Sequence, residues 1–204
     1  MFIPHNMLMC DVTKQHEFIE QFGFALLVSQ DLQMTHIPLT LVREEGELGT
    51  LYGHVARANA HWKMLDKSVV KAVFNGPHSY ISPSWYATGP AVPTWNYTAL
   101  HVTGQATLLD DEQTIAAVHT LVAQYEPALL KNEALMPVNY QHKLAKAIVG
   151  FKIEIEQIEG KQKLGQHKTV ADQQGTMAGL SRSKHSDAAA LLAYMQQVGI
   201  GIGL

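Results

Sequence analysis

The 204-residue sequence predicts a mainly β protein, a small antiparallel barrel with peripheral helices. The strand signal is an alternation of apolar and polar residues, seen most clearly at residues 34–43, 98–109 and 149–158. Segments with helical periodicity are short and fall between the strands and near the chain ends. This order differs from the regular strand–helix alternation of a parallel sheet, and we therefore expect antiparallel pairing.

The first third of the chain is predicted to form a short helix and then three consecutive antiparallel strands. Thr13 is a suitable helix N-cap, and Gly23 is a suitable stop. The expected strands cover residues 24–29, 34–43 and 48–55. A short helical segment at 56–65 and a β-branched strand at 68–74 follow.

Aromatic residues and prolines are concentrated at residues 76–86 and 93–97. The prolines predict an irregular path or an edge position for this segment. Core packing alone would not need the serines, threonine and asparagine that accompany the rings. The segment therefore predicts either the wall of a ligand pocket or a subunit interface.

The second half of the chain is predicted to be a long strand followed by helices and a last strand. Gly104, in the middle of the strand at 98–109, indicates a bulge or a close approach of another backbone. Asp110 and Gln113 form a capping-box pattern that starts a helix. The remaining expected elements are a helix at 140–148, a strand at 149–158, a basic loop at 160–168 and a final helix at 187–198 capped by Ser186. We expect a barrel domain over residues 1–180 and a C-terminal helix and tail over 181–204.

Composition and motifs exclude several classes of function. The formal net charge of −3 gives no electrostatic reason to expect nucleic-acid or membrane binding. The one cysteine, Cys10, excludes an intrachain disulfide and a Cys-based zinc site, and it favours a reducing, cytoplasmic setting. No apolar run is long enough to span a bilayer, and HExxH, Walker-type and GxSxG motifs are absent. His54 and His61 are seven residues apart rather than four, so no metal site is expected.

Two neighbouring segments are candidates for ligand binding. The first is the strand segment Thr35, His36, Ile37, Pro38 and Leu39. A proline inside a strand removes a ladder donor, so one side of this strand faces a ligand or is an ordinary sheet edge.

The second candidate segment, residues 53–62, leads from a strand into a helical start. Arg57 carries a planar donor fork that matches a phosphate, and His54, Asn59 and His61 add further donors. The alternative is a solvated arginine beside a packed Trp62. The basic loop at 160–168 has the same two interpretations, a second anion contact or a solvated surface.

Six stretches of the sequence resemble one known family. They are MFIPHNM, GHVARANAHW, FNGPHSYISPSWY, VPTWNYTALHVTG, IVGFKIEI and EGKQKLGQHK, in this order from residue 1 to about residue 180. The chain resembles the PaiB-type family of FMN-binding negative transcriptional regulators. The resemblance implies an antiparallel split β-barrel of the flavin-reductase and pyridoxamine-phosphate-oxidase type. It also implies a homodimer with FMN sites at the interface.

The resemblance assigns roles to the candidate residues. Thr35 to Leu39 would line the flavin ring, and His54, Arg57 and Asn59 would hold its phosphate. The aromatic segment with Trp95 and Asn96 would close the site, partly from the other subunit, and Lys161, Lys163 and Gln166 would approach it from the C-terminal loop. The sequence departs from the family at Gly23 and Ala60, where the family has proline, and at Gly165, where it has serine.

Three functions follow from these observations. The first is a flavin-dependent negative regulator; because the sequence has no helix-turn-helix or basic recognition helix, direct DNA binding is not expected and regulation can be indirect. The second is an FMN-dependent oxidoreductase or flavin reductase, in which His36 could tune the flavin or donate a proton. The third is a related split barrel that binds haem or another planar ligand through one of the histidines.

Overall fold

The computed structural model describes residues 1–204 and divides into two compact units. Unit 1 comprises Met1–Cys10, Asn75–Leu100 and Glu159–Leu204, and unit 2 comprises Asp11–Phe74 and His101–Ile158. Three long strands contribute residues to both units: β6 (Ser68–Ile81), β7 (Thr94–Leu108) and β8 (Ile148–Lys163). None of the helices has the length and apolar composition that a membrane span requires.

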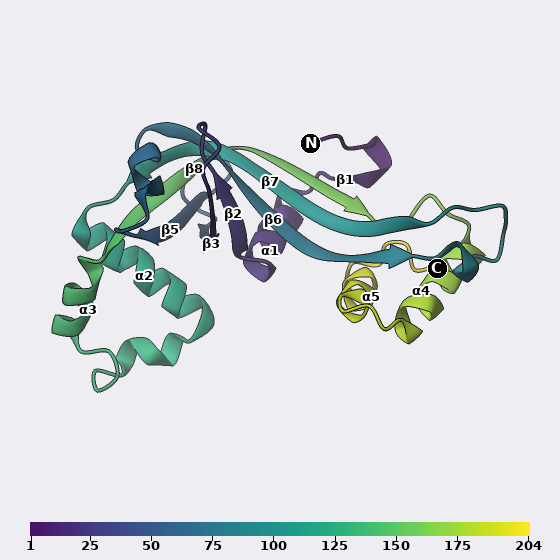
Figure 1. The fold of residues 1–204 in the computed structure, drawn as a ribbon. Coiled ribbons are helices and arrows are strands. Elements are labelled where there is room, and N and C mark those ends of the chain that lie inside the picture. Colours follow the sequence, from purple (N-terminus) through teal and green to yellow (C-terminus); the bar gives the residue numbers. More distant parts are fainter. The chain divides into compact units, whose positions relative to one another are not determined.

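The predicted antiparallel sheet with peripheral helices is confirmed (Figure 1). The strand order is β3-β2-β6-β7-β8-β5-β4, and β1 (Leu8–Met9) pairs with β8. The other strands are β2 (Phe24–Val28), β3 (Met34–Pro38), β4 (Thr40–Val42) and β5 (Thr50–Ala56). Observed pairs β2–β3, β2–β6, β4–β5 and β5–β8 are all antiparallel.

The predicted run of three consecutive paired strands is wrong in one respect. The expected strand at 34–43 is two strands, β3 and β4, which lie at opposite edges of the sheet. Pro38 ends β3, and the N–H of Leu39 bonds to the carbonyl of Gly23 at 2.9 Å instead of continuing a ladder. Because only Leu39 separates β3 from β4, the two edges are brought together there and the sheet curls.

The helices of unit 2 begin largely where the sequence predicts. Helix α1 (Val12–Gln21) is capped by Asp11, whose carboxylate accepts from the N–H of Thr13 at 2.9 Å, so the cap lies two residues before the predicted one. Helix α2 (Asp111–Tyr125) starts at the predicted capping box of Asp110 and Gln113. The segments η2 (Ala60–Met64) and η4 (Pro127–Lys131) and helix α3 (Val138–Ala145) complete the unit. Figure 1 shows α3 beside α2.

Gly104 makes the close backbone approach that the sequence predicts. A Cβ at this position would lie 2.1 Å from the carbonyl oxygen of Glu154 on β8. Around this contact the core of unit 2 is formed by fully buried side chains, among them Leu27, Leu51 and Phe151. The glycine therefore permits the tight contact of β7 with β8 in the curled sheet.

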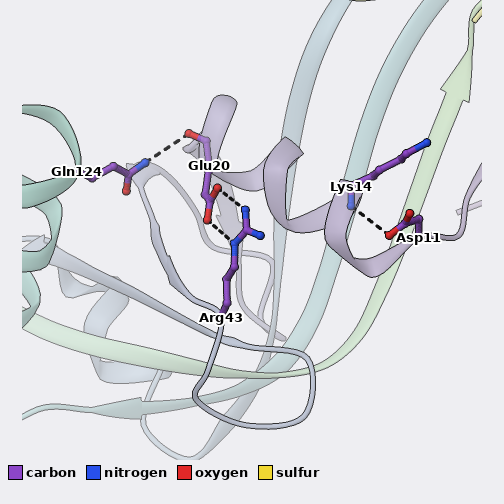
Figure 2. Close-up of polar contacts among 5 residues, drawn as sticks. All are labelled: Asp11, Lys14, Glu20, Arg43 and Gln124. Atoms are coloured by element: carbon purple, nitrogen blue, oxygen red, sulfur yellow. Dashed lines mark hydrogen bonds and ion pairs between the residues drawn. The ribbon is translucent and has the colours of Figure 1, made fainter. Parts of the chain in front are cut away.

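An ion pair ties α1 to the end of β4 (Figure 2). Both nitrogens Nε and Nη2 of Arg43 donate to the carboxylate of Glu20, at 2.7 and 2.6 Å. The backbone carbonyl of Glu20 also accepts from Gln124 on α2, at 3.3 Å. One residue of α1 thus links three parts of unit 2.

We expect Arg43→Ala to lower the free energy of unfolding by about 1 kcal/mol, because the pair is bidentate but partly exposed. Urea unfolding at low ionic strength measures this loss. In 1 M salt the loss should shrink, since exposed charges are screened. An equal loss at both salt concentrations would show that packing of the arginine stem, and not the charge pair, stabilises this corner.

Unit 1 contains η1 (His5–Met7), β1, η3 (Pro83–Trp85) and helices α4 (Val170–Arg182) and α5 (Ala188–Val198). Figure 1 shows α4 and α5 side by side. Helix α4 was not predicted, because two glycines interrupt its apolar pattern. Both glycines pack on Trp85: a Cβ on Gly175 would lie 2.0 Å from its carbonyl oxygen, and one on Gly179 would lie 2.1 Å from its ring.

Two further boundaries differ from the sequence prediction. The residue before α5 is Asp187, and no side-chain cap bond is made there, so the predicted Ser186 cap is wrong. Strand β8 continues to Lys163, so the predicted basic loop begins as a strand.

The aromatic segment is more regular than predicted. Strand β6 continues through Pro77 to Ile81, and β7 already begins at Thr94. Of the two predicted arrangements, the irregular path is wrong for residues 76–81, while the edge position agrees with the end of the β2 pairing at Val73. The pairing of β2 with β6 ends at Val73, so Pro77 lies beyond it, where a missing N–H leaves no β2 acceptor unpaired.

Candidate functional site

A hydrogen-bonded cluster in unit 2 joins the end of β2, the strand β3 and the start of η2. We call it the His61 network; its members are Ser29, Asp31, Thr35, Asn59 and His61. The imidazole of His61 is 1% exposed and is bonded at both nitrogens, through Nε2 to Ser29 Oγ at 3.0 Å and through Nδ1 to Thr35 Oγ1 at 2.7 Å. The orientation of the His61 ring is therefore fixed by hydrogen bonds at both nitrogens.

The chemistry of the partners fixes the direction of every bond in this network. The carboxylate of Asp31 can only accept, so the hydroxyl of Ser29 donates to it and accepts from Nε2–H of His61. Nδ1 of His61 then carries no proton and accepts from the hydroxyl of Thr35. Thr35 Oγ1 accepts in turn from Asn59 Nδ2 at 3.2 Å, and Asn59 Oδ1 accepts from the backbone N–H of His61 at 3.1 Å.

Burial lowers the pKa of His61, and the charge of Asp31 only partly opposes this effect. The unfolded chain, with an ordinary histidine pKa near 6.5, therefore takes up a proton before the folded chain does. The stability that neutral His61 contributes is complete above about pH 6.5 and is lost as the pH falls towards the lower folded pKa.

We expect the free energy of unfolding to fall between pH 7.5 and pH 5.5, by at most about 1.4 kcal/mol per pH unit for each such histidine. Burial also lowers the pKa of His54 and His167, so the slope is shared. His61→Asn should flatten the slope by removing one titrating group. Urea unfolding at both pH values tests this, and identical slopes for wild type and variant would contradict it.

Of the candidate segment, Thr35 to Pro38 belong to β3 and Leu39 follows it. Strand β3 is an edge strand that pairs with β2 on one side only. The predicted unpaired side is therefore present. The side chains of Ile37 and Leu39 are buried in the core, and the backbone N–H of Leu39 bonds to Gly23 on the β2 side. Because alternate residues of a strand direct their backbone groups to opposite sides, the backbone of His36 and Pro38 faces the free edge. His36 is exposed on the opposite face from Thr35, and its ring lies 6.1 Å from that of Phe24.

Arg57 is exposed, but its guanidinium is held in place by the protein. Nε donates to the carbonyl of Lys146 at 2.8 Å and Nη2 to that of Ile148 at 2.9 Å. The backbone N–H of Arg57 bonds to Ala147 at 2.8 Å. The N–H groups of Nη1 have no partner, so the fork is oriented and still has donors for an anion.

Of the predicted phosphate residues, the structure brings Asn59 to Thr35 but separates His54 from both. Residue 54 alternates with the core-facing residues of β5, and its ring lines a different cavity with side chains of α2 and α3. The sequence prediction missed Ser29 and Asp31. The only signal for them is a Ser-x-Asp turn directly after an apolar strand.

The aromatic segment of unit 1 forms an open hollow of about 430 Å³. Its lining residues are Asn75, Gly76, His78, Trp95 and Tyr97. Trp95 is 53% exposed, which is unusual for so large an apolar side chain. The pocket wall or subunit interface stays a prediction at this hollow, and Asn96, the next residue along β7, is buried.

The predicted C-terminal residues of the site hold unit 1 together in this structure. Lys163 Nζ donates to Thr94 Oγ1 at 2.5 Å and to the carbonyl of Trp95 at 2.7 Å. Partial burial and the charges of Lys161 and Lys168 lower its pKa, while Tyr97 opposes this shift.

Lys161 and Gln166 bind the N-terminal segment. Lys161 Nζ lies 5.2 Å from the ring centroid of Tyr97 and donates to the carbonyl of Phe2 at 3.0 Å. Gln166 Nε2 donates to the carbonyls of Asn6 and Gln162, at 2.9 and 2.6 Å. No group of three or more His, Cys, Asp and Glu side chains is arranged to hold a metal ion.

Comparisons with known proteins agree with this architecture. The family model described as "Putative FMN-binding domain" matches residues 1–157. The Bacillus subtilis protein "Protease synthase and sporulation protein PAI 2" is 29% identical, over 96% of this chain and 97% of the relative. An uncharacterized protein of Emericella nidulans is 32% identical, over 72% of this chain and 74% of the relative.

Solved structures show the same fold at low sequence identity. The flavocytochrome Anf3 of Azotobacter vinelandii aligns with a TM-score of 0.61 at 18% identity, over 79% of this chain and 71% of that chain. The FAD and heme binding protein of Mycobacterium smegmatis aligns with a TM-score of 0.58 at 11% identity, over 78% of this chain and 74% of that chain. The predicted antiparallel split-barrel fold is thereby confirmed. Because the family model covers more than half of the sequence and the bacterial relative aligns over almost its whole length, the chain belongs to the PaiB-type family of FMN-binding proteins, and its cofactor is FMN.

Proposed function

We propose that this protein is a cytoplasmic, homodimeric regulator that lowers transcription in response to bound FMN, without itself contacting DNA. The relative that aligns over nearly its full length is named for protease synthesis and sporulation, which supports a regulatory role. A net charge of −3 offers no surplus of cations for the phosphates of DNA, which supports an indirect route.

The observation that carries the FMN site is the anchored guanidinium of Arg57. Two backbone carbonyls hold it, so its free N–H groups are oriented before an anion arrives, and little side-chain freedom is lost on binding. Asn59, two residues further along the chain, keeps one amide N–H besides the one that it donates to Thr35. These residues fit a phosphate, and because the ring of His54 lines another cavity, we assign the FMN phosphate to Arg57 and Asn59.

The flavin ring is assigned to the segment Thr35 to Leu39, along the free edge of β3. The His61 network fixes the side chain of Thr35, and Pro38 leaves this edge without one backbone donor. Bound FMN would supply one-electron and two-electron redox chemistry. The hollow at Trp95 is a second proposed flavin contact surface, and Lys163 and Lys161 contact its lining residues Trp95 and Tyr97. Trp95→Ala tests this surface by its effect on FMN affinity.

Direct and indirect regulation are separated by a gel-shift titration with promoter DNA at stated salt. We expect no sequence-specific shift with or without FMN. In cells, a reporter should be repressed by the wild-type protein and released by Arg57→Ala. A specific shift at physiological salt would contradict the indirect route, and equal repression by the variant would contradict flavin dependence.

The alternative is an FMN-dependent oxidoreductase, and the exposed imidazole of His36 on β3 favours it. A histidine at this place could hold or deliver a proton beside a reduced flavin. Steady consumption of NADH or NADPH in the presence of FMN, diminished by His36→Ala, would support this alternative. Size-exclusion chromatography with light scattering tests the homodimer in the same preparation.

A further inference from the structure

A cavity in unit 2 borders the assigned phosphate site, because Ile148 lines it and the carbonyl of Ile148 also anchors Arg57. It encloses about 250 Å³ among β5, α2, α3 and the segment before α3. It is lined by His54, Ile115, Val118, His119, Leu135, Met136, Tyr140, Gln141, Leu144, Ala145 and Ile148. We propose that this cavity, which we call the α2–α3 pocket, binds a small uncharged ligand with one aromatic ring and a hydroxyl or N–H donor.

The size of the α2–α3 pocket sets the size of the ligand. An apolar protein cavity of about 150 Å³ is enough for benzene, and pockets for drug-sized molecules begin at about 300 Å³. The pocket at about 250 Å³ lies between these values, so it suits a single ring with a short substituent and is too small for FMN. Aliphatic and aromatic side chains form most of its wall.

The polar groups of the pocket determine that the ligand must carry a hydrogen-bond donor. Gln141 donates from Nε2 to the carbonyl of Met136 at 2.7 Å, which orients its amide. Its oxygen, 2.6 Å from Nε2 of His119, can only accept, so His119 carries its proton on Nε2 and has a bare Nδ1. His54 has no hydrogen-bond partner in the structure. Each ring thus offers an unused imidazole nitrogen to a ligand donor.

The charge of the pocket excludes ionised ligands. No Lys, Arg, Asp or Glu lines it, so a carboxylate or an ammonium group would lose its hydration without gaining an opposite charge. Burial lowers the pKa of His54, which favours the neutral form of its imidazole.

The mouth of the pocket indicates that a ligand would cover apolar surface. Leu135, Tyr140 and Leu144 line the cavity and are also largely exposed to solvent. Closing such a surface over an apolar ring removes both from water, which is favourable.

The full-length protein, with FMN present, should be titrated with phenol, toluene and benzoate and followed by amide NMR shifts. Phenol should bind saturably and move the signals of residues around the pocket; toluene should bind about 5- to 10-fold more weakly, and benzoate not measurably. The preference for phenol over toluene should disappear in His54→Leu or in His119→Leu. Absence of saturable phenol binding, or the same preference in both variants, would overturn the proposal.

A blocking variant separates this pocket from the flavin site. Val118→Phe fills the cavity and should abolish phenol binding while FMN affinity stays unchanged. Should this variant fold poorly, Ala145→Leu fills the same space with a smaller side chain, and the wild-type NMR map alone still decides where phenol binds. Phenol binding that survives both fillings, or NMR shifts confined to unit 1, would contradict the assignment.

Discussion

Replacing Arg57 by alanine is expected to weaken FMN binding about 30- to 100-fold, equivalent to about 2 to 3 kcal/mol. The guanidinium is oriented by two carbonyls and keeps unshared N–H groups, so its removal deletes a preformed, charge-assisted contact with the phosphate. Fluorescence quenching of FMN by the titrated protein measures the affinity. Arg57→Lys should recover only part of it, because an ammonium group keeps the charge but cannot form the fork.

The control for this prediction is Arg182→Ala, which removes an exposed arginine from the last turn of α4. It should leave FMN affinity unchanged. Since Arg57 also holds the segment between α3 and β8, circular dichroism and thermal unfolding must show that the Arg57 variants remain folded. Folded Arg57→Ala protein with wild-type affinity would place the phosphate elsewhere.

The largest expected loss of stability belongs to Gly104→Ala. The added Cβ would lie 2.1 Å from the carbonyl oxygen of Glu154 and 2.9 Å from the side chain of Ile153. The carbonyl of Glu154 belongs to the backbone and cannot change rotamer as a flexible side chain can, so β7 and β8 must move apart. We expect the free energy of unfolding to fall by about 3 kcal/mol or more.

Urea unfolding measures this loss, with Gln105→Ala on the same strand as the control. Gln105 is only half-buried, so its truncation should cost less than about 1 kcal/mol. A similar small effect of both substitutions would mean that the contact of β7 with β8 is looser than the structure shows.

Local patterns in the sequence were enough for much of the fold. The alternation at 98–109, the capping box at Asp110 and the glycine at 104 each depend on neighbouring residues, and each has the predicted structure. Helix α4 and the continuation of β6 through Pro77 could not be predicted in this way. Both depend on residues that are distant in the sequence. The glycines of α4 pack on Trp85, and Pro77 is tolerated in β6 because the pairing with β2 has already ended.

In the candidate site, too, local sequence predicts some residues, while contacts between distant residues could not be predicted. The sequence predicts a phosphate site at Arg57 and Asn59, because a guanidinium and an amide lie two residues apart directly after a strand. The carbonyls that orient Arg57 are 89 and 91 residues away in the chain, and Ser29 is 32 residues from His61. Such contacts are set by the curl of the sheet, which brings β2, β3 and η2 together, and no local pattern encodes them.

The most direct measurement is the absorption spectrum of the purified protein, followed by titration with FMN. Flavin bands in the purified protein, or saturable quenching of added FMN at one flavin per chain, are expected, together with the loss of affinity in Arg57→Ala. A colourless protein that leaves the fluorescence of added FMN unchanged would contradict flavin binding, and a haem spectrum would show that another planar ligand occupies the protein.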